Sequence, residues 1–405
     1  MRKFLETVII GGGQAGLSLS YYLHSLGREH IVLEKTAQPG DAWRNQRWDS
    51  FTLVTPNWTF LLPGAEYQGV DPGGFMPRRE IVDRFEAYVQ DYHLPVHYGT
   101  QVTCVEPADH RGYRVLTQDS TLQADNVVVA TGLFQTPKIP LFASHIPPEI
   151  HQIHSGQYRS PQGLPPGAVL VVGSAQSGCQ IAEELYQAGR KVFLCVGSSG
   201  RVPRRYRERD TFDWLSLCGF LDRTPDKLPS PQARFAGNPH LSGKNGGHSL
   251  NLHQFYRDGV ALLGRLRGVQ DGELSFAPDL MENLAKADKL EADILKLIDD
   301  YISNTQIAAP LDQLPVLTDG YAAPEIDRLE FQASGIAAII WAGGYAFDFS
   351  LVRLPAFDVY RFPLTERGVS RFPGLFFLGM PWLHTQKSGL LMGVGEDAAY
   401  LAGRI

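Results

Sequence analysis

The sequence predicts an α/β fold with two dinucleotide-binding domains of the Rossmann type. One observation is the stretch TVIIGGGQAGLSLSYYLHSLG at residues 7–27, in which an apolar strand, a glycine turn and a helix follow one another. The other is a second unit with the same order, AVLVV, GSAQSG and CQIAEELYQAG, at residues 168–189. A strand that turns through glycines into a helix is the phosphate-binding signature of this fold.

In the first unit each glycine has its own task. Gly11 allows the tight turn, Gly13 lets the backbone approach a pyrophosphate, and Gly16 lets helix and strand pack closely. The helix N–H groups then face the anion. The next apolar strand, HIVLEK, contains Glu34, 18 residues after Gly16, close to the roughly 20 expected for the acid that holds a ribose hydroxyl.

The composition indicates an ordinary soluble protein with two domains. The chain has 405 residues, 43% hydrophobic and 20% charged, which is long for one core. A net charge of −6 argues against nucleic acid or an anionic membrane as the main partner. No signal-peptide pattern opens the chain, and the most apolar late run, residues 333–347, is too short to span a membrane. We therefore expect a cytoplasmic protein.

The four cysteines, at positions 104, 179, 195 and 218, form neither a CxxC nor a CxxxxC pair. They are expected to be small buried hydrophobic residues, without a disulfide or a metal. A flavin enzyme that passes electrons to disulfides needs a redox-active pair, so this class is disfavoured.

Between the two units, residues 39–63 form an irregular, aromatic segment, PGDAWRNQRWDSFTLVTPNWTFLLP. It is either a loop that wraps a ligand or a packed surface loop. We expect a helix at about 78–92, short strands near Val102 and Tyr113, and an apolar strand at 126–130 that leads into ATGLFQTPKIP.

In this order, GxGxxG, GDAWR, RWDSFTLVTP, ATGxxxxPxxP and IHSGQYRSP resemble motifs of the flavin-containing monooxygenases and of their bacterial relatives, FAD/NAD(P)-dependent oxidoreductases of the cation-transporter-associated type. The resemblance covers nearly the whole chain. It implies that the first unit binds FAD, through Gly11, Gly13, Gln14, Ala15, Gly16, Glu34, Lys35, Trp43, Arg44, Val102, Ala130, Thr131 and Gly132.

One family motif, FxGxxxHxxx[YF], is only partly present. His154 and Tyr158 match, whereas Pro148 and Ile150 replace the Phe and the Gly. We favour His154 as a linker residue that orients the two domains by hydrogen bonds over a catalytic role.

The second unit predicts an NADPH site at Gly173, Ser174, Ala175, Gln176, Ser177 and Gly178. The strand after it, KVFLCV, ends at Gly197 and not at an acid, and Ser198, Arg201 and Arg204 follow. Arginines without a neighbouring carboxylate suit a 2′-phosphate better than a ribose hydroxyl. The alternative is that these arginines form a solvated face.

From residue 206 to about 310 the sequence is less informative. His240, His248 and His253 lack a metal-ligand spacing, so a loop over cofactor or substrate is expected at 237–253. Apolar residues recur every three or four positions over residues 280–301, which predicts an amphipathic helix of about six turns. This helix covers the core, or else forms a lid or the contact of a homodimer.

We expect the chain to return to the FAD domain near its end. The apolar strand 336–341 leads into WAGGYAFD, with Ala342 and Gly343 in the family's second ATG-like turn. A closing helix is expected to start at Gly389, beside Leu390, with its N-terminus facing the flavin. The predicted domains are 1–160 with 315–405 for FAD, and 161–314 for NADPH.

The resemblance implies an NADPH-dependent monooxygenase that transfers one oxygen atom from O2, through a hydroperoxyflavin, to a small nucleophilic nitrogen, sulfur or carbonyl compound. Asn57 is the catalytic candidate, as an asparagine that hydrogen-bonds the peroxide, with a turn-forming role as the alternative. The alternative function is a flavin reductase or dehydrogenase that passes electrons to another acceptor.

Overall fold

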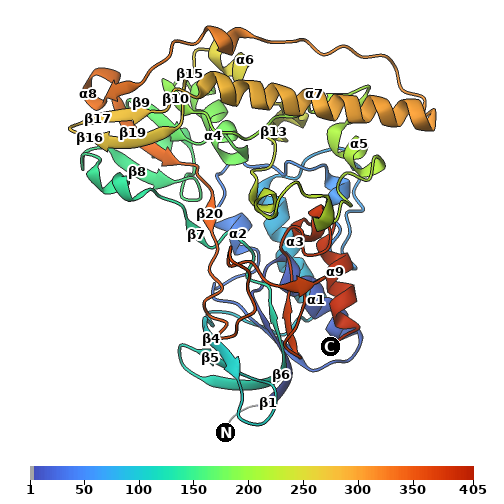
Figure 1. Cartoon of the computed structure of the whole chain (residues 1–405). Helices are drawn as coiled ribbons and strands as arrows, with labels where there is room; N and C mark the ends of the chain where they lie inside the picture. Colours follow the sequence, from blue (N-terminus) through green and yellow to red (C-terminus); the bar gives the residue numbers. More distant parts are fainter. Residues whose placement is uncertain (1–3) are drawn as a thin grey trace.

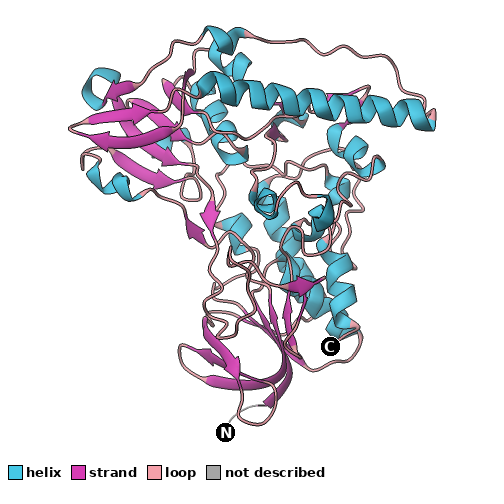
Figure 2. Ribbon diagram, in the orientation of Figure 1, coloured by secondary structure: helices cyan, strands magenta, loops and turns pink. Residues whose placement is uncertain are grey.

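The computed structural model describes residues 4–405. Its strands are concentrated in two separate sheets, at the lower end and the upper left of the view in Figure 2, and helices cover both. Two short strands, β7 (Thr136–Pro137) and β20 (Tyr345–Ala346), pair in the narrow region between the sheets (Figure 1).

The first sheet contains the opening strand at its centre. Its order is β21-β22-β23-β6-β1-β2-β3, with β5 and then β4 attached beside β6. β1 pairs in parallel with both β2 and β6. The bounds are β1 Phe4–Ile10, β2 His30–Leu33, β3 Val96–His97, β4 Val102–Pro107, β5 Tyr113–Thr117, β6 Thr121–Val129, β21 Thr365–Glu366, β22 Val369–Ser370 and β23 Leu375–Phe377.

Both faces of β1 are buried, which explains its unbroken apolar sequence. Val8 and Ile10 contribute to one hydrophobic cluster, and Ile9 points into a second cluster on the opposite face. The first helix α1 (Gln14–Ser25) and the last helix α9 (Val394–Ala402) meet in that second cluster. Both ends of the chain therefore build the first domain, as Figure 1 shows.

The second sheet is all parallel, in the order β15-β10-β9-β19-β8. Its bounds are β8 His151–His154, β9 Ala168–Val172, β10 Val192–Cys195, β15 Ala261–Leu263 and β19 Ile336–Trp341. A three-stranded antiparallel sheet, β16 (Leu266–Gln270), β17 (Glu273–Phe276) and β18 (Arg328–Glu330), lies next to it. The minor pairs are β11 Arg205–Tyr206 with β12 Arg209–Asp210, and β13 Leu241–Ser242 with β14 His248–Ser249.

The expected domain boundaries at 160/161 and 314/315 are wrong in this sheet. β19 pairs with β9 on one side and β8 on the other, so residues 151–154 and 336–341 belong to the second domain. The sequence could not show this, because an apolar strand is buried in either sheet and its pattern does not name its neighbours.

The remaining helices are α2 Asp41–Arg44, α3 Arg78–Asp91, α4 Gln176–Gln187, α5 Thr211–Leu217, α6 Leu252–Arg257, α7 Leu280–Thr305 and α8 Phe331–Ser334. Single 3-10 turns are η1 Asn57–Thr59, η2 Leu141–His145, η3 Pro161–Gly163, η4 Pro225–Lys227, η5 Pro231–Phe235, η6 Lys244–Gly246, η7 Asp319–Ala322 and η8 Gln386–Gly389. The predicted helices at 78–92 and 280–301 are confirmed as α3 and α7. The expected start of the closing helix at Gly389 is wrong: Gly389 ends η8, and α9 begins five residues later.

Within residues 4–405, we find no helix with both the length and the apolar character needed to cross a bilayer.

Candidate functional site

The first glycine turn separates glycines that the fold requires from one that it does not. Gly11 has φ +111°, and a Cβ there would lie 2.6 Å from the Ala130 carbonyl oxygen. A Cβ on Gly16 would lie 1.9 Å from the Gly11 carbonyl oxygen. At Gly13, by contrast, φ is an ordinary −84°, and none of the described protein atoms would lie within 4 Å of a Cβ. Gly13 is therefore free of protein contacts on the side where a pyrophosphate would approach.

The second turn repeats this geometry. Gly173 has φ +113°, and its Cβ would lie 2.7 Å from the Ala342 carbonyl oxygen. A Cβ on Gly178 would lie 1.8 Å from the Gly173 carbonyl oxygen. Ala175 has φ −76° and ψ −172°, nearly the −84° and −172° of Gly13. The backbone that leads into α1 and the backbone that leads into α4 therefore have the same conformation, and each leaves the first N–H groups of its helix at the end of a turn.

Two of the predicted FAD residues lie at the second turn instead. Ala342 follows β19 and abuts Gly173, as Ala130 follows β6 and abuts Gly11. Gly343 is the next residue. Assignment of Ala342 and Gly343 to the FAD site is therefore wrong, for the same reason that the domain boundary is wrong.

Glu34 lies where the motif expects it, beside the first turn. Its two carboxylate oxygens accept hydrogen bonds from the Gly12 N–H at 2.6 Å and the Thr36 N–H at 2.8 Å. The Glu34 carbonyl accepts the Thr100 N–H at 2.9 Å, which brings the start of β4, with Val102, to the end of β2. Lys35 is exposed beside it.

The second unit has a hydroxyl at the corresponding place. The Ser174 Oγ accepts the Gly197 N–H at 3.0 Å, so turn and strand end are tied together without a carboxylate. Ser177 follows in the first turn of α4, and Ser198 is exposed just beyond the strand.

A glutamine opens each of the two helices and holds a distant segment against its turn. The Gln14 side-chain amide donates to the Gly389 carbonyl at 2.8 Å. The Gln176 side chain donates to the Leu241 carbonyl and accepts the Leu241 N–H at 3.0 Å. The segments that include Leu390 and His240 are thereby held beside the first and second turns, respectively.

Ala130, Thr131 and Gly132 flank the first turn, as predicted. The Ala130 N–H donates to the Ile10 carbonyl at 2.8 Å. The Gln135 amide donates to the Thr131 hydroxyl oxygen at 3.1 Å and to the Gly132 carbonyl at 2.8 Å.

The aromatic segment 39–63 is largely packed into the protein. Trp48, Phe51 and Phe60 are buried in a hydrophobic cluster with α3. Trp43 is half-buried, and Arg44 forms an ion pair with Glu86 at 2.6 Å. The packed-loop alternative describes most of this segment.

Asn57 is not available as a hydrogen-bond donor to a peroxide in the manner expected. The side chain is buried, its Oδ1 accepts the Met76 N–H at 2.7 Å, and its Nδ2 donates to the Asp71 carbonyl at 3.0 Å. Asn57 therefore organises the loop 71–76, and its assignment as a catalytic residue is wrong. The sequence could not reveal the partners, which lie 14 and 19 residues away.

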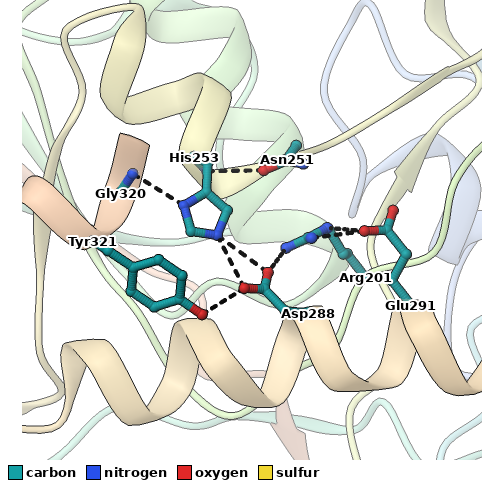
Figure 3. A network of polar contacts seen from close by, with 7 residues as sticks. All are labelled: Arg201, Asn251, His253, Asp288, Glu291, Gly320 and Tyr321. Carbon is teal, nitrogen blue, oxygen red and sulfur yellow. Dashed lines mark hydrogen bonds and ion pairs between the residues drawn. The ribbon is translucent and has the colours of Figure 1, made fainter. Parts of the chain in front are cut away.

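Arg201 is likewise engaged within the protein. Figure 3 shows its guanidinium between two acids of α7: it donates to Glu291 at 2.6 and 2.9 Å and to Asp288. Asp288 also accepts hydrogen bonds from Tyr321 and from His253 Nε2, the latter at 3.1 Å (Figure 3). Arg201 is only 4% exposed, so its prediction as a phosphate ligand is wrong. The signal that was missed is the pair of acids on the buried side of an otherwise apolar helix face.

Arg204 is buried and internally paired as well. It donates to the Val54 carbonyl at 2.7 Å and forms an ion pair with Asp210 at 2.5 Å. Its guanidinium also lies 4.8 Å from the Phe75 ring centre. Its assignment to NADPH is therefore wrong for the same reason: the charge stabilises a contact between the two domains.

His154 ends β8 and is hydrogen-bonded to the connection that leads back to the first domain. Its Nδ1 accepts the Gly156 N–H at 3.2 Å, so Nε2 carries the proton and donates to the Gly344 carbonyl at 3.0 Å. Gly344 precedes β20 in the connection between the sheets (Figure 1). Burial lowers the pKa of His154. Both partners lie just beyond strands of the second sheet, so the role of His154 in orienting the two domains stays a prediction.

Two glycine turns of matching geometry, each at the carboxyl end of a strand with parallel neighbours, define an oxidoreductase with two dinucleotide sites. The chain belongs to the pyridine nucleotide-disulphide oxidoreductase family, whose model matches residues 8–211. It is a flavoprotein oxidoreductase related to the flavin monooxygenases, and its family binds FAD and NAD(P)H.

Among curated proteins, the chain is 32% identical to "Uncharacterized oxidoreductase CzcO-like" of Geobacillus kaustophilus, over 100% of this chain and 99% of the relative. Among solved structures it matches the flavin-containing monooxygenase of Stenotrophomonas maltophilia, with a TM-score of 0.65, 20% identity, and coverage of 99% and 98%. The bacillithiol disulfide reductase of Bacillus cereus also matches, with a TM-score of 0.62, 16% identity, and coverage of 99% and 98%.

Proposed function

We propose that this protein is an FAD-dependent, NADPH-using monooxygenase that transfers one oxygen atom from O2 to a small nucleophilic nitrogen, sulfur or carbonyl compound. The observation that carries the proposal is the pair of matched turns, at Gly11–Gly16 and Gly173–Gly178, in a chain that offers no dithiol. When bound, FAD supplies the hydride-accepting and oxygen-activating chemistry. The chain's own residues bind and orient the two dinucleotides.

The residues present fit that task. The N-termini of α1 and α4 supply backbone N–H groups for two pyrophosphates. Gly13 leaves room for the first, and Glu34 lies where a ribose hydroxyl would be held. We infer that the β7 and β20 pair, with the His154 hydrogen bond to Gly344 beside it, helps to orient one dinucleotide unit toward the other.

The alternative is an NAD(P)H-dependent flavin reductase or dehydrogenase that passes electrons to another acceptor. The fold is compatible with it, since a bacillithiol disulfide reductase shares the architecture. The thiols argue against direct disulfide chemistry, because burial raises the pKa of Cys179 and of Cys195 and no described cysteine is paired with another. A thiol kept protonated is a poor nucleophile.

The preference for NADPH has a narrower basis than expected. Arg201 and Arg204 are both paired with acids inside the protein, so they no longer support a preference for NADPH. The remaining argument is that Gly197 and Ser198 stand where an NAD-specific site would have a carboxylate, so a 2′-phosphate would meet no negative charge there. We therefore expect NADPH to be used with only a modest advantage over NADH.

A direct test compares electron acceptors. Oxidation of NADPH by the purified holoenzyme is followed in air with a panel of amines, thioethers and ketones, while oxygen uptake and hydrogen peroxide are measured together. A monooxygenase consumes oxygen without releasing an equal amount of peroxide once a substrate is present. Fast anaerobic turnover with a quinone, and none of the panel oxygenated, would support the alternative.

A further inference from the structure

We propose that Arg47, Arg159 and Tyr345 form a site for an oxyanion at the junction of the two domains, and that this site takes the carboxylate of the substrate. The inference rests on the proposed function, because that function requires a small substrate in addition to the two dinucleotides. Figure 1 shows that α2, which precedes Arg47, and β20, which contains Tyr345, lie together between the two sheets.

Arg47 is a half-buried cation without a counter-ion. Its Nη1 donates to the Gln46 carbonyl at 2.8 Å, and its guanidinium carbon lies 5.3 Å from the Trp43 ring centre and 5.5 Å from that of Phe51. Among residues 4–405 no carboxylate lies within ion-pair distance of it. Asp49, the acid nearest in sequence, is paired with Arg78 at 3.0 Å. Burial lowers the pKa of Arg47, as expected for a desolvated cation.

Arg159 adds a second guanidinium, whose partners among the described residues are all backbone carbonyl groups. It donates to the Arg47 carbonyl at 2.9 Å, to those of Tyr158 and Gly156 at 3.1 and 3.3 Å, and to that of Asn45. These bonds fix the backbone that carries Arg47 but leave the charge unbalanced. A partly buried charge normally has an ionic partner. Two neighbouring guanidiniums that pair with no described carboxylate therefore indicate that an external anion binds between them.

Tyr345 supplies a phenol beside these charges. Its ring is held between His154, at a centroid distance of 4.6 Å, and Phe134, at 5.6 Å. Burial raises the pKa of Tyr345, whereas Arg47 and Arg159 oppose that rise, so both charges act on the phenol. No described group hydrogen-bonds its hydroxyl. A Cβ on Gly156 would lie 2.3 Å from that oxygen, so the glycine at this position preserves the place of the phenol.

An oxyanion here could come from a carboxylate or from a dinucleotide phosphate. We favour the carboxylate, because the two glycine turns already provide backbone N–H groups for both pyrophosphates. The surroundings are also aromatic: Trp43 and Phe51 lie near the Arg47 guanidinium, and Phe134 lies beside the ring of Tyr345. Guanidinium and phenol donors with flat apolar neighbours suit a planar organic acid.

The test uses benzoate as the probe and benzamide, its neutral counterpart of the same shape, as the control ligand. Binding of each to the oxidised holoenzyme is measured by calorimetry, with no NADPH and no turnover. We expect benzoate to bind more tightly than benzamide. In Arg47→Met its affinity should fall by roughly ten- to a hundredfold, and in Tyr345→Phe by about two- to tenfold. Arg79→Met, an exposed arginine on α3 with 93% of its side chain accessible, is the matched control.

Retention of FAD and affinity for NADP+ are measured on the same variants. Unchanged values together with lost benzoate binding support the substrate site. Weaker NADP+ or FAD binding with benzoate unaffected would assign the anion site to a dinucleotide phosphate and overturn the proposal. Equal binding of benzoate and benzamide by the native protein would also overturn it.

If Arg47→Met does not fold, Arg47→Lys keeps the charge and should retain most of the selectivity for benzoate. Because no turnover is involved, loss of the oxygen chemistry would leave this result standing.

Discussion

Gly13 and Ala175 occupy equivalent backbone positions, since both have nearly the same φ and ψ at the start of a helix. They differ in that Gly13 leaves the space of a side chain free for a ligand, whereas Ala175 fills part of it with its Cβ. Gly13 has no described protein atom near its absent side chain, whereas Gly11 and Gly16 are pressed against backbone carbonyls. Of these three glycines, only Gly13 has room for a Cβ among the described protein atoms.

A substitution at Gly13 can therefore test FAD binding without disturbing the fold. Gly13→Val should leave the unfolding temperature close to native, because the added Cβ has no described protein atom within 4 Å, but reduce the FAD content below about a tenth. The ratio of visible to ultraviolet absorbance after purification measures occupancy. Gly73→Val, at an exposed loop glycine that is also free of neighbours, is the control. Full occupancy in Gly13→Val would show that FAD is bound elsewhere.

Arg201 provides a residue-scale prediction of the opposite kind. Arg201→Ala would leave Asp288 and Glu291 without their cation, which should lower the free energy of unfolding by about 3 kcal/mol. The ratio of the KM values for NADPH and NADH should not change. Urea unfolding and flavin-reduction kinetics measure the two effects. A selective loss of NADPH affinity in a stable variant would restore Arg201 as a phosphate ligand.

At this scale the sequence shows which residue types are present but not what they contact. The arginines after β10 look free along the chain, yet the partners of Arg201 lie 87 and 90 residues further on. The glycine turns are different, because every functional position falls within one short segment. Local motifs could therefore be predicted, and long-range pairings could not.

At the scale of elements, the glycine-turn units and the helices α3 and α7 followed from the sequence pattern, whereas most elements between residues 206 and 280 and the membership of strands in a sheet did not. β19 is as apolar as the last three residues of β6, 127–129, and each strand is followed by a small turn residue, Ala342 or Ala130. The two are distinguished only by their neighbours, β9 and β8 in one case and β1 and β23 in the other. The start of α9 was missed because Gly389 to Gly393 continues an apolar, helix-like pattern while it forms turns.

His154 makes the element that links the domains sensitive to acid. A folded-state pKa below the usual value of about 6.5 means that the unfolded chain binds a proton more readily. The stability contribution of neutral His154 is thus present above that value and is lost as the pH falls through it. A proton on Nδ1 would also remove the acceptor of the Gly156 N–H.

We expect His154→Asn to be less stable than the native protein near neutral pH but to lose less stability on acidification. The free energy of unfolding is measured at about pH 7.5 and about pH 5.5. His110→Asn, at an exposed loop position, serves as the control and should keep the native slope. Burial lowers the pKa of His30 and His240 as well, so part of the slope persists. An unchanged slope in His154→Asn would contradict the neutral, Nε2-protonated state assigned here.

For the whole molecule, the chain's two ends form one dinucleotide domain and its middle forms the other. Gln14 bonded to Gly389 joins the ends, and the paired strands β7 and β20 carry both crossings between the domains. The long helix α7 is fixed to the middle domain by the network around Asp288 (Figure 3). This arrangement was predictable in outline from two strand-turn-helix units separated in sequence.

The central claim is that reduced flavin in this protein reacts with oxygen as a monooxygenase and does not simply release electrons. The most direct measurement reduces the holoenzyme with NADPH in the absence of oxygen and then mixes it rapidly with oxygenated buffer, while the absorbance spectrum is recorded. We expect an absorbing species, distinct from both the reduced and the oxidised flavin, that persists for seconds or longer and decays faster when an oxidisable substrate is added. Direct return of the reduced spectrum to the oxidised one, with an equal amount of hydrogen peroxide released, would contradict the claim.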